Sequence, residues 1–171
     1  MEERMGTERK TGPSIGEAQE RWREEFSGIG DEFDRYTWLM ALGEGLRGIP
    51  EKERTQDLLF SGCMSRVWMR LEEKDGRLSL RTDSDTLILR GILFLLEDLL
   101  DERTCAEVGS AKIDLFREMD LESVFNGTRK KGMGSLVSEI QKFARERGDD
   151  FGKEKRDGNN AVKAGRNLQG D

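Results

Sequence analysis

The chain has 171 residues, of which 35 are acidic and 29 basic, so its formal net charge is −6. This length suits one domain, and the negative charge argues against a general nucleic-acid binder, whose affinity depends on neutralising phosphates. The sequence contains no histidine, which excludes His-dependent bases and triads. We therefore expect one domain that binds no nucleic acid.

Membrane segments, signal segments and the number of cysteines bear on the class of protein and on its compartment. No apolar run reaches the roughly 18 residues that a membrane helix needs, and the N-terminal stretch has no apolar signal segment, so we expect a cytoplasmic protein without membrane contact. Cys63 and Cys105 are too few for a disulfide framework and lack the spacing of a metal site. Residues 1–18 and 148–171 are polar and charged, and are predicted to be disordered on either side of a domain at 19–147.

The first predicted elements are helices. Residues 17–26 predict a weak helix. Residues 31–46 predict an amphipathic helix that begins after Asp31 as N-cap. Its apolar stripe consists of Phe33, Tyr36, Met40 and Gly43 and is widened by Leu39, Leu42 and Leu46. We expect this stripe to face the core.

A β-hairpin follows over residues 65–81. In its first strand apolar residues alternate with Arg66, Trp68 and Arg70, the second strand alternates in the same way, and Asp75-Gly76 between them is a favoured hairpin turn. We interpret the face that carries the arginines and Trp68 as a solvated outer face rather than a ligand site.

The longest apolar segment predicts a central buried helix over residues 87–100. We interpret the preceding triplet Asp83-Ser84-Asp85 as its N-terminal cap, in preference to a metal site or a carboxylate pair. Gly91 inside this helix disfavours helix formation by roughly 1 kcal/mol relative to Ala, which indicates close packing against another backbone.

The C-terminal part is predicted to be helical. Short helices are expected over residues 105–125, with a turn at Gly109-Ser110. The last helix is expected to begin after Thr128 as cap and to end at Gly148.

The two cysteines are the candidates for chemistry. Cys63 stands in FSGCMSRVW next to Gly62, in a predicted loop, and two interpretations remain open: a reactive thiol or a small buried hydrophobe. A reactive Cys63 would exchange groups rather than hydrolyse bonds because no His is available, and its positive neighbours would be Arg66 or the cluster at 129–131. Cys105 begins a short helix, which would lower its pKa, but we interpret it as structural.

Five segments, in order, resemble the motifs of a known family. They are DRYTWLMALG (34–43), IPEKERT (49–55), SGCMSRVW (61–68), DSDTLILRG (83–91) and TRKKGM (128–133). Together they are similar to the SufE-like sulfur acceptors of iron–sulfur cluster assembly.

The resemblance implies an α+β fold of the SufE and IscU kind, with a small antiparallel sheet of about three strands covered by helices. It implies that Cys63 accepts persulfide sulfur from a SufS-type cysteine desulfurase, stimulates that enzyme and passes the sulfur to a SufBCD-type scaffold. No cofactor is expected on this chain, since pyridoxal phosphate belongs to the desulfurase. Such a protein is a sulfur-transfer activator rather than a stand-alone enzyme, and we expect a monomer or weak homodimer. Arg129 matches the family's arginine and, with Arg66, is expected to stabilise the thiolate or persulfide or to dock the partner.

The chain departs from the family pattern around the cysteine. Met64 and Arg66 replace two glutamines, and Leu58 stands where the family often has an asparagine. An alternative therefore stays open: a non-catalytic module that docks on a desulfurase or scaffold, with an unreactive Cys63.

Overall fold

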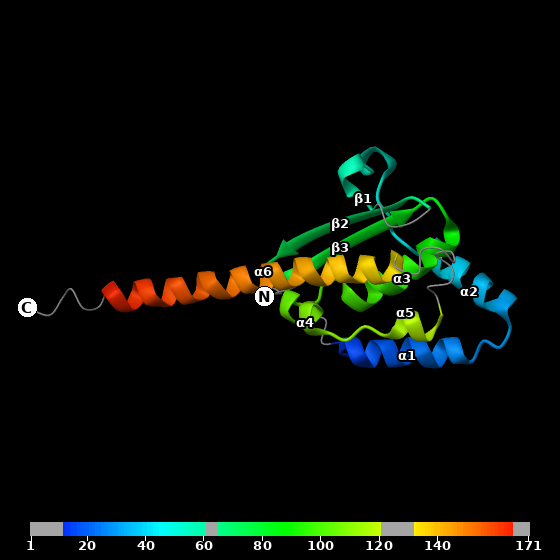
Figure 1. The fold of residues 1–171 in the computed structure, drawn as a ribbon, viewed down its shortest axis with the longest axis horizontal. Helices are drawn as coiled ribbons and strands as arrows, with labels where there is room; N and C mark the ends of the chain where they lie inside the picture. Colours follow the sequence, from blue (N-terminus) through cyan, green and yellow to red (C-terminus); the bar gives the residue numbers. More distant parts are fainter. Residues whose placement is uncertain (1–11, 61–64, 121–131, 166–171) are drawn as a thin grey trace, which may run out of the picture.

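A three-stranded antiparallel sheet forms one layer of the computed structural model, which describes residues 12–60, 65–120 and 132–165 (Figure 1). Its strands lie in the order β1 (Leu59–Phe60), β2 (Val67–Lys74) and β3 (Arg77–Ser84). Helix α3 (Leu87–Leu100) contacts β3, and α6 (Gly132–Gly165) contacts β2, so these two helices form the layer beneath the sheet. The predicted α+β fold with about three antiparallel strands is confirmed.

The β2–β3 hairpin has the predicted turn. Its strands pair from Val67 with Ser84 at one end to Lys74 with Arg77 at the other. Asp75 and Gly76 both have positive φ angles, 54° and 80°, as a two-residue type I′ turn requires. The sequence signal was sufficient here because the turn and the strand alternation are both local.

Helices α2 (Glu32–Glu44) and α3 pack closely through two glycines. A Cβ added to Gly91 would lie 2.0 Å from the carbonyl oxygen of Leu39, and one added to Gly43 would lie 2.3 Å from that of Leu87. The close backbone approach predicted from Gly91 is therefore confirmed. The predicted N-cap is also present, since the Asp31 carboxylate accepts a hydrogen bond of 3.0 Å from the Phe33 amide.

The stripe predicted for α2 is wrong at its first member. Phe33 is 73% exposed, whereas Leu39 is 1% exposed. The face of α2 that meets α3 is set by Leu39 and Gly43, because these positions allow the two backbones to approach. Phe33 is therefore directed away from the core.

The N-terminal helix α1 (Ile15–Ser27) belongs to the packed domain. Ser14 caps it by accepting a hydrogen bond from the Glu17 amide, and Ile15 and Ala18 lie in the core. The Trp22 indole donates to Asp98 of α3 at 2.8 Å. The helix thus begins before residue 19, where the domain was expected to start.

The remaining elements complete the helical layer. They are the short helices α4 (Cys105–Ser110) and α5 (Leu115–Glu118), and the 3-10 turns η1 (Glu51–Glu53) and η2 (Gln56–Leu58). The predicted short helices are confirmed up to residue 120. Within this described part of the chain, no helix has both the length and the apolar character needed to span a bilayer.

Helix α6 packs its first half on the domain and then extends beyond it (Figure 1). Met133, Leu136, Ile140 and Ala144 are buried. The predicted end at Gly148 is wrong, because a glycine inside a helix has only a modest unfavourable effect and α6 continues to Gly165. The predicted cap, Thr128, lies outside the described residues.

Candidate functional site

The described residues on either side of the predicted cysteine define the two ends of the connection that carries it. Cys63 and Met64 lie outside the described residues, but the chain before and after them is defined. Phe60 at the end of β1 pairs with Val67 at the start of β2. Because partners in an antiparallel pair have Cα atoms only about 5 Å apart, the connection that carries Cys63 begins and ends at neighbouring points of the sheet.

The main chain of Arg66 anchors the end of this connection to the beginning of α3. Its amide donates to the Asp85 carboxylate at 3.2 Å, and its carbonyl accepts from the Ser84 hydroxyl at 2.8 Å. The Asp85 amide approaches the same carbonyl at 3.4 Å. Arg66 is exposed, so its charge is presented at the surface three positions after Cys63.

Asp83 is the centre of a buried ionic cluster. It is 1% exposed, and one carboxylate oxygen accepts from the Ile49 amide and from Arg54, both at 2.8 Å. The other oxygen pairs with Arg90. A buried carboxylate needs such compensation, because leaving water without partners is strongly unfavourable. Asp83 thereby holds the segment after α2, strand β3 and helix α3 together.

The capping role predicted for the Asp83-Ser84-Asp85 triplet is wrong. The N-cap of α3 is Thr86, which makes no side-chain cap hydrogen bond. Asp83 and Ser84 belong to β3 and serve the ionic cluster and the Arg66 anchor instead. Among the described residues no group of three or more His, Cys, Asp or Glu side chains is placed to hold a metal ion.

Trp68 on the predicted outer face of β2 is covered, which corrects the prediction for that residue, whereas Arg66 is exposed as predicted. Trp68 is 8% exposed, and the guanidinium of Arg54 lies over its ring, 5.2 Å from the centroid. Arg54 therefore joins the buried Asp83 to the strand that follows Cys63. The spacing of IPEKERT gave no sign of this contact, because residue 54 and residue 68 meet only through the tertiary fold.

Cys105 is a core residue. It is 1% exposed at the first position of α4, below the cap formed by Thr104. Burial raises the pKa of its thiol, and the nearby negative charge of Glu73 acts in the same direction. The helix N-terminus does not overcome these effects, so the Cys105 thiol is protonated near neutral pH.

Arg129, the other predicted site residue, lies outside the described residues. Of the predicted set the structure thus describes Arg66, and it adds residues that motif reading did not assign to the site. Arg54 and Arg90 bind Asp83 on the strand that pairs with β2, and Asp85 holds the main chain of Arg66. The available signal was their position inside two of the quoted motifs, 49–55 and 83–91, which gave no contact partners.

The fold and the site together define an α+β domain that carries a cysteine between the first two strands of a small antiparallel sheet. Comparison with known families then assigns the class. The profile described as "SufE: Fe-S metabolism associated domain" matches residues 20–144. The chain belongs to the SufE family.

Individual relatives agree with this membership. The chain is 28% identical over 123 residues to the sulfur acceptor protein CsdE of Escherichia coli K12, covering 71% of this chain and 84% of CsdE. It is 26% identical over 126 residues to an uncharacterised SufE-like protein of Rhizobium meliloti, covering 71% and 90%. A solution structure of a hypothetical protein from Thermus thermophilus has the same fold, with a TM-score of 0.60 at 16% identity, covering 76% of this chain and 95% of that one.

Proposed function

We propose that this chain is a sulfur acceptor whose Cys63 takes persulfide sulfur from a SufS-type cysteine desulfurase. It stimulates that enzyme by removing its persulfide, and it delivers the sulfur to a SufBCD-type iron–sulfur scaffold. Membership of the SufE family and the similarity to the sulfur acceptor CsdE support this proposal.

The observation that carries the proposal is the contrast between the two cysteines. Cys105 is buried, and its thiol pKa is raised, so it is a poor nucleophile. Cys63 belongs to the short connection between β1 and β2, whose following residue Arg66 is anchored through its main chain and exposed. An acceptor thiol needs access and ionisation, and the buried Cys105 lacks both, so Cys63 is the proposed acceptor.

The transfer is a thiol exchange. The Cys63 thiolate attacks the terminal sulfur of the partner's cysteine persulfide, forming a new S–S bond. The partner's S–S bond breaks, and its cysteine leaves as a thiolate, so there is no net oxidation or reduction. No general base of the His type is required, which suits a chain without histidine. Pyridoxal phosphate acts on the desulfurase alone.

We propose that two positive residues favour the ionised form of Cys63. The exposed Arg66 places a cation three positions away, and a nearby cation lowers the pKa of a thiol. Arg129 is proposed to act in the same way, on the thiolate or persulfide, or in docking the partner.

Mass spectrometry tests the proposal. The protein is incubated with its desulfurase, pyridoxal phosphate and cysteine, and the added sulfur is located by peptide mapping. We expect one added sulfur on Cys63 in the wild type and in Cys105→Ser, and none in Cys63→Ser. Sulfur only on Cys105, or undiminished stimulation of the desulfurase by Cys63→Ser, would refute sulfur acceptance and favour the docking module.

A further inference from the structure

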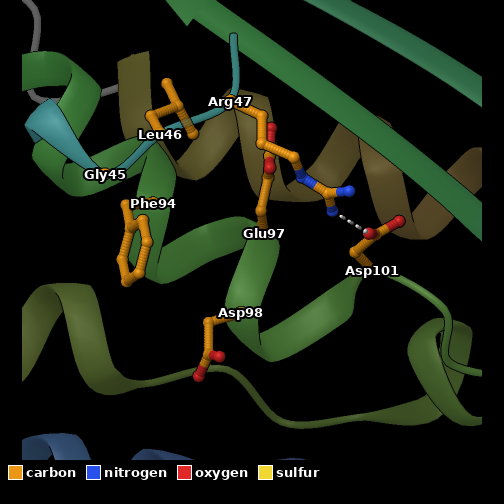
Figure 2. Close-up of a pocket in the computed structure, with 7 residues that line it drawn as sticks. All are labelled: Gly45, Leu46, Arg47, Phe94, Glu97, Asp98 and Asp101. Atoms are coloured by element: carbon orange, nitrogen blue, oxygen red, sulfur yellow. Dashed lines mark ion pairs between the residues drawn. The ribbon is translucent and has the colours of Figure 1, made fainter. Parts of the chain in front are cut away.

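A cavity of about 130 Å³ lies between the end of α2 and the middle of α3 (Figure 2). One wall is the main chain that follows α2, and the other is one face of α3. The lining residues are Gly45, Leu46, Arg47, Phe94, Glu97, Asp98 and Asp101. Positions 94, 97, 98 and 101 share one side of a helix, so α3 lines this space with one aromatic and three acidic residues. Of the three carboxylates, Asp98 is held by the Trp22 indole and points away from Glu97 and Asp101 (Figure 2).

One carboxylate oxygen of Glu97 is open to solvent and has only a long ion pair, since none of the buried side-chain oxygens and nitrogens in the described residues lacks a hydrogen bond. The residue is 7% exposed, and its other oxygen accepts from the amide and the hydroxyl of Thr82, both at 2.7 Å. The nearest cation to the free oxygen is Arg81, at 4.0 Å, which is too long for a hydrogen bond. Burial raises the pKa of Glu97, and the nearby charge of Asp101 acts in the same direction, against the Thr82 hydrogen bonds and Arg81.

The chain's own Arg47 lies at the mouth of the cavity. Figure 2 shows its side chain passing beside Glu97 towards Asp101. The Arg47–Asp101 ion pair measures 3.6 Å, and the Arg47 side chain is 66% exposed. Asp101 is already held at 2.9 Å by the Leu80 amide and at 3.0 Å by Arg81. Exposed pairs of this kind contribute little, so Arg47 is easily displaced.

We propose that this cavity binds an alkylguanidinium group, which displaces Arg47 and donates hydrogen bonds to Glu97 and Asp101. The planar guanidinium presents several donors in a fork that suits two carboxylates, and it stacks on aromatic rings such as Phe94. An engineered cavity of about 150 Å³ holds a benzene molecule, so the volume here suffices for a group of this size. The group belongs either to an arginine side chain of a protein or to a free small molecule.

Amide chemical shifts of the full chain test the proposal. Methylguanidinium is titrated into wild type, Glu97→Gln and Arg47→Ala, with ethylammonium as the cation control and Glu72→Gln, on an exposed position of β2, as the matched variant. We expect saturable shifts at residues 45–47 and 94–101 with a millimolar dissociation constant. Glu97→Gln should weaken binding at least about tenfold, because it removes a charged acceptor.

A second variant and a peptide ligand distinguish the possible outcomes of the titration. Arg47→Ala should bind up to about fivefold more tightly because the competitor is gone, and it supplies the test if Glu97→Gln does not fold. An acetylated Gly-Arg-Gly amide that binds more tightly than methylguanidinium indicates a protein side chain as the natural occupant, and equal affinity indicates a small cation. The absence of saturable shifts, equal binding by Glu97→Gln, or equal binding of ethylammonium would overturn the proposal.

Discussion

The buried carboxylate of Asp83 makes a quantitative prediction. Asp83→Asn keeps the shape of the side chain but leaves Arg54 and Arg90 without their common anion. Charged hydrogen bonds contribute about 1.5–3 kcal/mol each, and the low value applies here because the two arginine side chains are 27% and 23% exposed. The free energy of unfolding should therefore fall by about 3 kcal/mol, and Tm by about 6–12 °C for a chain of this size.

Urea unfolding followed by tryptophan fluorescence measures this loss. The matched control is Glu53→Gln, which removes the charge of a carboxylate paired with Arg70 at 3.4 Å, where the Glu53 side chain is 48% exposed. That control should change stability by less than about 0.5 kcal/mol. A loss below about 1 kcal/mol in Asp83→Asn would show that the cluster does not support this part of the fold.

Three further perturbations test other parts of the structure. Gly91→Ala should destabilise the protein by several kcal/mol, because its Cβ would lie 2.0 Å from the α2 main chain. The control Gly134→Ala, with open space around the Cβ, should be neutral or stabilising by up to about 1 kcal/mol. Calorimetry that found equal Tm shifts for the two variants would contradict the close helix contact. The pKa of Glu97 is higher in the folded protein than in the unfolded chain, so this group should make the free energy of unfolding fall as pH rises above 4.5. Glu97→Gln should remove this dependence of stability on pH, measured by urea titrations at several pH values. An unchanged pH dependence argues against the burial effect. Asp85→Asn weakens the anchor of Arg66, so hydrogen exchange at the Arg66 amide and alkylation of Cys63 should both become faster while stability falls by about 1 kcal/mol; unchanged rates would show that the anchor does not constrain this segment.

The sequence predicted the elements that depend on local signals. The dipeptide Asp75-Gly76 favours a tight turn by itself, and residues 87–100 are apolar enough to require burial. Gly91 disfavours the helix it stands in, so its presence indicates close packing. These features need only neighbouring residues, so alternation and spacing were sufficient to identify them.

The support of the candidate site could not be predicted in the same way. The position of Asp83 just before a helix predicts a cap, but two of its actual partners lie 29 and 34 positions earlier in the chain. The alternation of residues in β2 predicts an exposed Trp68, but the Arg54 guanidinium covers its ring in the folded chain. The cavity beside Glu97 likewise combines the end of α2 with α3, which no spacing rule brings together. Charged residues give a weak periodic signal, because burial of a charge depends on a specific distant partner.

The Asp83 cluster also has a consequence for folding kinetics. Its contacts join segments 29 and 34 positions apart, and Arg90 reaches the carbonyls of Leu46 and Gly43 across 44 and 47 positions. Closing such long loops is entropically unfavourable, so we expect these contacts to form after the β2–β3 hairpin and the helices have come together. Contacts that are absent from the transition state control the unfolding rate, so we expect the Asp83 cluster to affect how long the native state persists more than how quickly it forms.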